Sequence, residues 1–544
     1  MRKGFAFTLV ASCAAFCNAQ PIEITVNGTP SVGRSSQISP LIYGVNFATS
    51  AQAAALNLPL NRSGGNATTR YNWQSDATSS GSDWYFLTHA TGGGPSQSID
   101  DWVTANRSSG VIGGTQSMIT IPIMGWVAKL TATGGWTWSF SVAKYGAQQQ
   151  SEPGRPDAGN GVKPNGTHVT GNDPNDANKP VQTSYQQGWL EHLVNRFGTA
   201  QNGGVKYYLL DNEPGLWHET HRDVMPANVT MQGLFDRQRD MALLVKSVDP
   251  TALVCGPEEW GWLGYLYSGS DFQWLQAHNW QGNPPDRAAH NNMDQAPWLL
   301  QQFAAASQTA GKRLLDVFSL HYYPQGSYSW SDNSQAASLW RNRATRSLWD
   351  PNYTDESWIG QKINLIPRMK GWVNSYYPGT QIGITEYIWG DDNVISAALA
   401  QADALGIFAR EGVNLATRWV CPATNSLTFR VFQMYRNYDG NGSTFGDLLG
   451  STITTANPDE LAVHTGYATA TRRLSVMMIN KKLTGTTQVR VIKPNADRSP
   501  KAKLYRLTES GGLQQLSDQT GVSGTFILDL PPQSVTLLVM LPGS

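Results

Sequence analysis

Lys206-Tyr-Tyr-Leu-Leu-Asp-Asn-Glu-Pro214 is the segment that decides the fold of this 544-residue chain. Its first part is a short apolar run, which is typical of a strand buried on both faces of a parallel sheet. The run ends in Asn212-Glu213-Pro214, so polar side chains stand at the carboxyl end of the expected strand. The same pattern, an apolar run that ends in polar or aromatic residues, recurs along the chain.

Eight runs of this kind alternate with helical patterns. The runs are Leu41–Phe47, Leu58–Asn66, Ser117–Trp126, Lys206–Pro214, Ala252–Trp260, Leu314–Pro324, Thr380–Trp389 and Leu415–Pro422. Between them lie stretches with a helical pattern, among them Ser184–Phe197, Met231–Val248, Pro297–Ala310, Gln361–Tyr377 and Ser396–Glu411. Eight strand–helix units predict the α/β class and a (β/α)8 barrel of the TIM type over residues 39–453.

Two long segments interrupt the alternation. Lys129–Pro180 follows the third run, Tyr265–Ala296 follows the fifth, and both are rich in polar residues, Gly and Pro. Loops that follow barrel strands emerge at the face where barrel active sites lie. We therefore expect both segments to form walls of a cleft.

The pattern changes near residue 454, after which short strand-like runs follow one another without a convincing helix. The runs are Leu474–Asn480, Gln488–Ile492, Ala502–Leu507, Gly524–Leu530 and Ser534–Leu541. They predict a smaller all-β sandwich over residues 454–544. The run Ile22–Val26, within residues 20–38, is expected to add a strand, so that both ends of the chain build this domain.

Residues 1–19 have the features of a secretory signal peptide. Arg2 and Lys3 precede a short apolar run, and Ala19 offers a small residue for cleavage. The run is too short to span a bilayer. We expect the protein to be secreted, either extracellular or periplasmic. Lipoprotein processing at Cys13 ranks lower, because the apolar run continues past that residue.

Composition narrows the class of partner. Forty basic and 40 acidic residues give a formal net charge of zero, which favours neither nucleic acid nor a membrane surface as partner. The 20 tryptophans are unusual, and a minority are expected to offer flat faces on which sugar rings stack. Beyond residue 19 the cysteines are Cys255 and Cys421, for which a disulfide and two free thiols both stay open. We expect a monomer.

Two carboxylates carry the chemistry. The seventh run, Gln381-Ile-Gly-Ile-Thr-Glu-Tyr-Ile-Trp389, places Glu386 near its carboxyl end, as the fourth run places Glu213. The fourth and seventh strands face each other across a barrel mouth. Glycosidic cleavage needs one protonated carboxyl group, which gives its proton to the leaving oxygen, and one ionised carboxylate, which attacks the anomeric carbon. Mutual repulsion and different surroundings separate the pKa values of the two groups. The pair predicts a glycoside hydrolase with Glu213 and Glu386 as catalytic residues, of the retaining type if the carboxyl groups lie ~5–5.5 Å apart and of the inverting type if the gap admits water.

Leu210-Asp-Asn-Glu-Pro-Gly-Leu-Trp-His-Glu-Thr-His221 resembles the acid/base region of glycoside hydrolase family 44. Further blocks resemble that family in the same order, namely Tyr43–Asn46, Asn61–Asn66 with Tyr71–Trp73, Ser319–Pro324 and Ile384–Tyr387. The resemblance implies a barrel plus a β-sandwich and retaining hydrolysis of cellulose-type β-1,4-glucans and xyloglucan. It also implies that Glu213 is the general acid/base and Glu386 the nucleophile.

Other residues at the ends of the runs are candidate substrate contacts. They are Asn46, Asn66, Trp73, Trp126, Asn212, His321, Tyr323, Trp389 and Trp419. We expect Asn212 to bond the 2-hydroxyl of the sugar, and we expect His321 and Tyr323 to contact Glu386 or the sugar. We expect Trp419 to stack under the sugar that is cut. Arg62 is expected to be an ion-pair residue near the site.

The predicted chemistry requires no cofactor. The family can carry structural calcium, and Asp391-Asp392 is a candidate cation site, but the sequence assigns no ligands. The expected partner is a β-glucan or xyloglucan. Two alternatives stay open: an endo-acting hydrolase of another β-linked polysaccharide such as xylan or mannan, and, ranked far lower because both glutamates are present, a non-catalytic polysaccharide-binding barrel.

Overall fold

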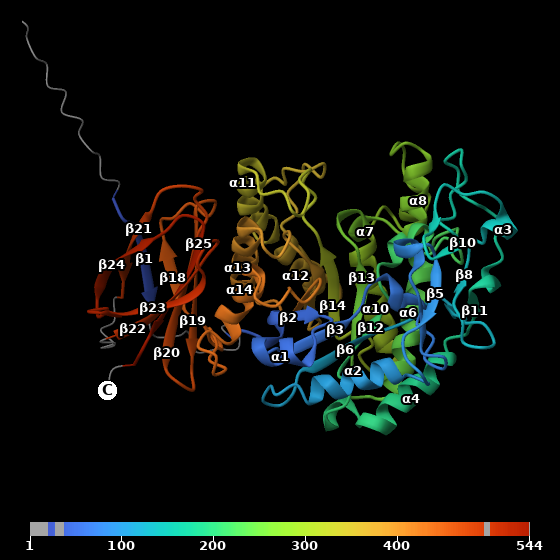
Figure 1. Ribbon diagram of the computed structural model, residues 1–544, viewed down its shortest axis with the longest axis horizontal. Helices are drawn as coiled ribbons and strands as arrows, with labels where there is room; N and C mark the ends of the chain where they lie inside the picture. Colours follow the sequence, from blue (N-terminus) through green and yellow to red (C-terminus); the bar gives the residue numbers. More distant parts are fainter. Residues whose placement is uncertain (1–19, 28–36, 494–500, 543–544) are drawn as a thin grey trace, which may run out of the picture.

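A closed barrel of eight parallel strands forms the larger part of the molecule (Figure 1). The computed structural model describes residues 20–27, 37–493 and 501–542, so the expected signal peptide lies outside the described residues. The strands are β2 (Gly44–Asn46), β3 (Leu60–Ser63), β6 (Gln116–Ile121), β12 (Tyr207–Leu210), β13 (Leu253–Glu259), β14 (Val317–Tyr322), β15 (Gln381–Tyr387) and β16 (Leu415–Arg418). They follow one another around the barrel in chain order, which confirms the predicted fold class.

Each barrel strand is followed by a helix. The helices are α1 (Ser50–Leu56), α2 (Gln97–Arg107), α4 (Tyr185–Phe197), α6 (Met231–Val248), α10 (Gln295–Ala310), α12 (Leu365–Tyr376), α13 (Ile395–Arg410) and α14 (Leu427–Arg436). Local sequence sets their ends: the Thr230 hydroxyl caps the first turn of α6, and Gly198 ends α4. Their apolar faces pack on the strands and build one continuous core.

The second domain is a sandwich of two antiparallel-rich sheets, which lies beside the barrel on the left of Figure 1. One sheet has the order β18-β1-β21-β24 and the other β17-β19-β20-β25-β22-β23. The members are β1 (Ile22–Asn27), β17 (Leu448–Leu449), β18 (Ser451–Thr454), β19 (Leu461–Ala468), β20 (Arg473–Asn480), β21 (Thr487–Ile492), β22 (Lys501–Thr508), β23 (Gly512–Thr520), β24 (Thr525–Leu530) and β25 (Ser534–Met540).

Both chain ends build the sandwich, because β1 pairs in parallel with β21 and antiparallel with β18. The strands β17 and β18 begin before residue 454, so the sandwich sheets start a few residues before the position at which the sequence pattern changes. The sequence gives little sign of β23, because this edge strand is largely exposed and lacks a regular apolar alternation.

Helix α13 lies between the barrel and the sandwich, and 15 of its 16 residues are buried. A helix that is apolar on all sides is typical of such a position. At this junction Asp403 of α13 pairs with Lys481 at 2.7 Å and with His464 of β19 at 2.9 Å. These buried contacts fix the sandwich against the barrel.

The two long segments form structure of their own. Within Lys129–Pro180 lie β8 (Thr137–Trp138), α3 (Val142–Tyr145), β9 (Ser151–Glu152), β10 (Arg155–Gly159) and β11 (Asn178–Pro180), and within Tyr265–Ala296 lie α8 (Gly269–Ala277) and α9 (Pro285–Ala289). Cys255 and Cys421 are both free thiols. Among the helices of the described chain, none has the length and hydropathy needed to cross a membrane.

Candidate active site

The carboxyl ends of β12, β13, β14 and β15 bring four titratable side chains together. Glu213 follows β12, Glu258 lies in β13, His321 in β14 and Glu386 in β15. The register places His321 directly beside Glu386, because a bulge in β15 between Ile384 and Glu386 shifts the pairing by one residue. Glu213 adopts φ +43°, which is uncommon outside glycine and is frequent at functional sites.

Glu213 and Glu386 face each other across a cavity of about 360 Å³. A carboxylate oxygen of each and a ring nitrogen of His321 all lie within 4.8 Å of one another. The cavity is lined by Gly65, Asn66, Asp83, Asn212, Glu213, Leu216, Trp260, Tyr323, Gln325, Glu386 and Trp419. The mouth of the barrel thus presents two opposed carboxyl groups in one polar and aromatic hollow.

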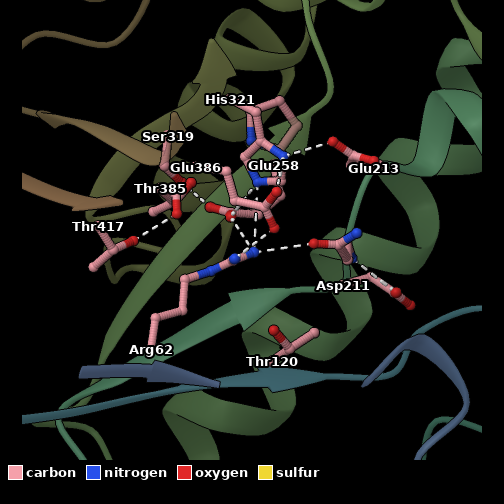
Figure 2. A network of polar contacts seen from close by, with 12 residues as sticks. Arg62, Thr120, Asp211, Glu213, Glu258, Ser319, His321, Thr385, Glu386 and Thr417 are labelled. Carbon is pink, nitrogen blue, oxygen red and sulfur yellow. Dashed lines mark hydrogen bonds and ion pairs between the residues drawn. The ribbon is translucent and has the colours of Figure 1, made fainter. Parts of the chain in front are cut away.

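Glu386 is held by two donors. Arg62 donates from Nη1 to Oε1 at 2.6 Å, and the Tyr323 hydroxyl donates to Oε2 at 2.6 Å. Arg62 reaches this position from β3 and lies among the carboxylates in Figure 2. Hydrogen bonds to both oxygens fix the orientation of the carboxylate at the cavity.

His321 lies between Glu213 and the other carboxylates, as Figure 2 shows. Its Nδ1 is 2.8 Å from Oε1 of Glu213 and 3.6 Å from Oε2 of Glu386, and its Nε2 is 3.3 Å from Oε2 of Glu258. Burial alone lowers the pKa of a histidine, but the three carboxylates outweigh it and raise the pKa of His321 to about 10. His321 is therefore a cation at neutral pH.

The surroundings of Glu213 raise the pKa of its carboxyl group. Burial raises its pKa, and Glu386 adds to the rise, while His321 and Arg62 oppose it. His321 and Arg62 balance the charge of Glu258 and Glu386, so the group is neutral when Glu213 is protonated. A raised pKa suits Glu213 to the role of general acid, and the two donors that hold Glu386 suit it to the role of nucleophile.

A chain of side-chain amides orders one wall of the cavity. Arg62 and the Gly65 N–H both donate to Oδ1 of Asn212, which leaves its Nδ2 to donate to Asn66 at 3.2 Å. Asn66 in turn donates to both oxygens of Asp83 at 3.2 Å. The remaining N–H of Asn212 is free for a ligand in the cavity.

Glycine makes room for the aromatic floor of the cavity. A Cβ on Gly65, where φ is +83°, would lie 2.3 Å from Cη2 of Trp419, and one on Gly64 would lie 2.2 Å from the Arg62 guanidinium. The ring of Trp419 packs edge-on against Phe47 at 5.7 Å. The pair of glycines therefore lets Arg62 and Trp419 approach the centre of the site.

The structure places six of the eleven sequence-predicted residues on the cavity wall: Asn66, Asn212, Glu213, Tyr323, Glu386 and Trp419. His321 lies buried behind them. Asn46 is fully buried: it donates to the backbone carbonyl of Arg418 and accepts a bond from Arg62, so it holds the arginine and cannot reach a sugar hydroxyl.

Three of the expected tryptophan platforms lie elsewhere. Trp389 is only 1% exposed and cannot stack on a sugar. Trp73 donates to the Tyr185 carbonyl and packs on that ring, whereas Trp126 lies in β7 (Trp126–Ala128), paired with β11. All three follow strand ends in sequence, but their side chains point into neighbouring elements and not into the cavity.

Other cavity residues carry no sequence signal of their own. Asp83, Trp260 and Gln325 line the cavity but belong to no recognisable motif. Exposed tryptophans adjoin them: Trp84 follows Asp83, Trp358 donates to Gln325 at 3.3 Å, and the ring of Trp330 lies 6.4 Å from that of Tyr323. None of the residues 129–180 or 265–296, all of which the structure describes, lines the cavity, so these segments are not its walls.

The candidate cation site at Asp391-Asp392 is not free. One oxygen of Asp392 accepts from Arg418 at 2.7 Å, and the other accepts the Ala423 N–H at 2.7 Å. In the described part of the chain, the one group of three or more His, Cys, Asp or Glu side chains that converges within 4.8 Å is Glu213, His321 and Glu386. The guanidinium of Arg62 supplies the positive charge there, which disfavours a metal ion.

Comparison with known proteins agrees with this geometry. The model of glycoside hydrolase family 44 matches residues 77–326. The chain is similar to the crystal structure of CelM2, a bifunctional glucanase-xylanase from a metagenome library, with 46% identity over 96% of this chain and 99% of that one and a TM-score of 0.92. It is also similar to a Paenibacillus polymyxa xyloglucanase of family 44 solved with xyloglucan, with 28% identity, coverage of 96% and 100%, and a TM-score of 0.77.

The chain is 30% identical to "Beta-mannanase/endoglucanase A" of Caldicellulosiruptor saccharolyticus over 94% of its residues, and it spans 38% of the length of that protein. The likeness to CelM2 extends over nearly the whole of both chains, and the motifs around Glu213 and Glu386 lie at one barrel mouth. The chain therefore belongs to glycoside hydrolase family 44.

Proposed function

We propose that this glycoside hydrolase is a secreted endo-β-1,4-glucanase that hydrolyses xyloglucan or cellulose-type β-glucans with retention of anomeric configuration. The observation that carries the proposal is the carboxyl pair, because oxygens of Glu213 and Glu386 approach within 4.8 Å. Retaining glycosidases hold their carboxyl groups ~5–5.5 Å apart, whereas inverting enzymes need ~6.5–9.5 Å to admit a water molecule. The spacing favours the retaining reaction.

The two glutamates divide the work. Glu386, bonded by Arg62 and Tyr323, attacks the anomeric carbon while Glu213 gives its proton to the leaving oxygen, so the glycosidic bond breaks as the glycosyl–enzyme ester forms. Glu213, now ionised, then takes a proton from water, which attacks the same carbon and releases Glu386. The free N–H of Asn212 is placed to bond the 2-hydroxyl, a contact that strengthens in the transition state.

An extended polymer suits the surroundings of the pair. Exposed Trp84, Trp330 and Trp358 adjoin the cavity on separate elements, and each offers a flat apolar face beyond the sugar that is cut. Platforms on more than one side of the cavity favour a chain that passes through it, and hence internal cleavage. The names endoglucanase and xyloglucanase among the relatives support the same substrate class.

Xylan and mannan are the second candidate substrates. The observation that favours them is that CelM2 is a glucanase-xylanase and that the Caldicellulosiruptor protein is a mannanase as well as an endoglucanase. Release of reducing sugar from xyloglucan, carboxymethyl-cellulose, xylan and mannan under matched conditions separates the candidates. A fall in viscosity before much sugar appears identifies endo action, and no release from any polymer contradicts the proposal.

Two variants test the roles. Glu386→Gln should abolish formation of the glycosyl–enzyme, because no ionised carboxylate faces the anomeric carbon. Glu213→Gln should lose acid catalysis, yet regain turnover with an activated aryl glycoside and azide, because neither protonation of the leaving group nor deprotonation of water is then needed. Near-normal turnover by Glu386→Gln would show that the assignment is wrong.

Secretion, a monomeric state and independence from cofactors belong to the same proposal. The apolar run before Ala19 supports export, and hydrolysis by two carboxyl groups and water uses no redox or metal chemistry. Expression of the full chain with recovery from the culture medium tests export, and size-exclusion chromatography tests the monomer. A structural calcium ion is tested by the Tm with and without a chelator.

A further inference from the structure

Glu258 is a fully buried carboxylate that lies behind the cavity and that the two-glutamate reaction does not use. A bulge sets its direction: Pro257 pairs with Ser319 and Glu259 with Leu320, which leaves Glu258 unpaired between them. Its φ of +61° is uncommon for glutamate. Bulges next to active sites redirect one side chain, and here the redirected side chain points at His321.

Every polar contact of Glu258 belongs to the catalytic network (Figure 2). Oε1 accepts the Ser319 hydroxyl, and Oε2 lies 3.3 Å from Nε2 of His321 and 3.4 Å from Nη2 of Arg62. Its backbone carbonyl accepts the N–H of Glu213 at 3.0 Å. Glu258 therefore reaches Glu213 both through the backbone and through the His321 ring.

His321 faces charged groups from every strand around it. Glu213 and Glu386 lie on the Nδ1 side, and Glu258 and Arg62 on the Nε2 side. Behind the ring, the Tyr265 hydroxyl donates to the His321 carbonyl, and His321 lowers the pKa of the more distant Glu259 without a hydrogen bond to it. With a carboxylate at each ring nitrogen, an imidazolium donates in both directions, as the raised pKa of His321 supports.

We infer that Glu258 is a positioning residue, which holds His321 between itself and Glu213 and thereby sets the pH range over which Glu213 can act as proton donor. This inference rests on the proposed role of Glu213 as general acid. Glu258 acts through His321 and touches neither the sugar nor the reacting atoms. The negative charge of Glu258 offsets the positive charges of His321 and Arg62, so that these cations lower the pKa of Glu213 less than they otherwise would.

The direction of the expected change follows from this balance. Glu258→Gln keeps the size of the side chain and an oxygen for Arg62 or Ser319, but removes one buried negative charge. Without that negative charge, the cations His321 and Arg62 stabilise the ionised form of Glu213 more strongly. The pKa of Glu213 therefore falls, and Glu213 loses its proton at lower pH. We expect the basic limb of kcat/KM to move to lower pH by about 1 pH unit, the size that a single charge at this range produces.

The adjacent residue provides a matched control. Glu259 is equally buried but points away from His321, and it accepts from the Gly215 N–H at 3.2 Å and from Gln295 at 2.7 Å. Burial raises the pKa of Glu259 to about 8, so it carries a proton at neutral pH. Glu259→Gln thus replaces one neutral group with another and should leave the position of the basic limb unchanged.

The experiment is a kcat/KM profile over about pH 4 to pH 9 on one soluble β-glucan for wild type, Glu258→Gln and Glu259→Gln. A shifted basic limb in Glu258→Gln alone supports the inference. A purely structural role would lower activity at every pH without moving the limb, and that outcome, or a profile that coincides with wild type, overturns it.

A second measurement covers the case in which Glu258→Gln does not fold. Nitrogen-15 NMR of the His321 ring in the wild-type protein, assigned with a His321→Gln variant, should show both ring nitrogens protonated at neutral pH. A neutral ring overturns the inference. Different results contradict the proposed function and the inferred role of Glu258. Turnover by Glu386→Gln would contradict the proposed function, but it would say nothing about the charge of His321.

Discussion

Nη1 of Arg62 lies 2.6 Å from Oε1 of Glu386, and the two side chains are 0% and 5% exposed. The partners are 324 positions apart in the chain and meet because β3 and β15 belong to one closed barrel. Removing one member of such a buried ion pair typically costs about 3–5 kcal/mol, because the other charge is left without a partner. Arg62 thus contributes both to the stability of the barrel and to the orientation of the nucleophile.

Arg62→Lys should lower kcat by about 10²-fold or more, since one ammonium cannot serve Glu386, Asn46 and Asn212 together as the planar guanidinium does. Steady-state kinetics at the pH optimum measure the loss, and thermal unfolding shows whether the variant is folded. Arg107→Lys, at the exposed end of α2, serves as the control. Wild-type kcat in Arg62→Lys would show that the guanidinium geometry is dispensable.

Tyr323→Phe removes the second donor to Glu386 without a change in shape. We expect kcat to fall by about 10–10²-fold with little change in Tm, because the lost bond stabilises a charge that changes during the reaction. The Tyr328→Phe variant, on the same loop but away from the cavity, should keep wild-type kinetics. A Tyr323→Phe variant that lost only stability would contradict a role at the nucleophile.

Gly65→Ala should displace Trp419. The new Cβ would lie 2.3 Å from the indole, at a φ of +83° that disfavours any side chain, so about 1–3 kcal/mol of stability should be lost. A floor moved by about 1 Å should cost up to about 10²-fold in kcat/KM. Gly371→Ala in α12 has open space around the Cβ, and should leave kinetics intact while raising stability by about 0.5–1 kcal/mol. Equal effects in both variants would exclude the steric explanation.

Alanine variants of Trp419 and Trp389 should affect different properties, namely substrate binding for Trp419 and the free energy of unfolding for Trp389. Trp419→Ala removes the cavity floor, so kcat/KM should fall by about 10-fold or more while much of the stability remains. Trp389→Ala empties a buried site and should cost about 3–5 kcal/mol in the free energy of unfolding. Chemical denaturation and KM for a soluble polymer are measured side by side. If Trp389→Ala impaired kcat/KM and Trp419→Ala mainly lost stability, the assignment of Trp419 to the substrate cavity would be wrong.

Asp403 should make the barrel–sandwich junction sensitive to acid. Burial alone would raise the pKa of Asp403, but Lys481 and His464 outweigh it and hold that pKa well below its usual value. A lowered folded-state pKa stabilises the protein above the unfolded value of ~3.9 and loses this contribution as pH falls below it. Asp403→Asn should lose about 3–5 kcal/mol at neutral pH.

The difference in Tm between wild type and Asp403→Asn should therefore narrow as pH falls below about 4. Asp529→Asn, on the exposed face of β24, is the control and should follow wild type throughout. A difference that stayed constant with pH would mean that the charge of Asp403 is not what holds the junction.

Much of the fold is encoded locally. All eight barrel runs became strands, and Met231–Val248 became α6 with the same ends, because apolar periodicity and end caps act within a few residues. The helices α2 and α14 and the strand β23 escaped prediction. The edge strand β23 is largely exposed and lacks a regular apolar alternation, so its pairing with β22 defines it and its own pattern does not. Helices α2 and α14 do present an apolar face to the core, so a missing pattern does not explain why they escaped prediction.

The sequence by itself determined the strand order, the two domains and the two glutamates, because each is written in a short segment with its own pattern. Only the tertiary structure decided which strand-end side chains share the cavity. Trp389 and Trp419 follow strands in the same way, yet one is buried and the other forms the floor. The physical reason is that the direction of a side chain depends on the strand register and on bulges. One extra residue in β13 turns Glu258 toward His321, and no local sequence pattern predicts this bulge.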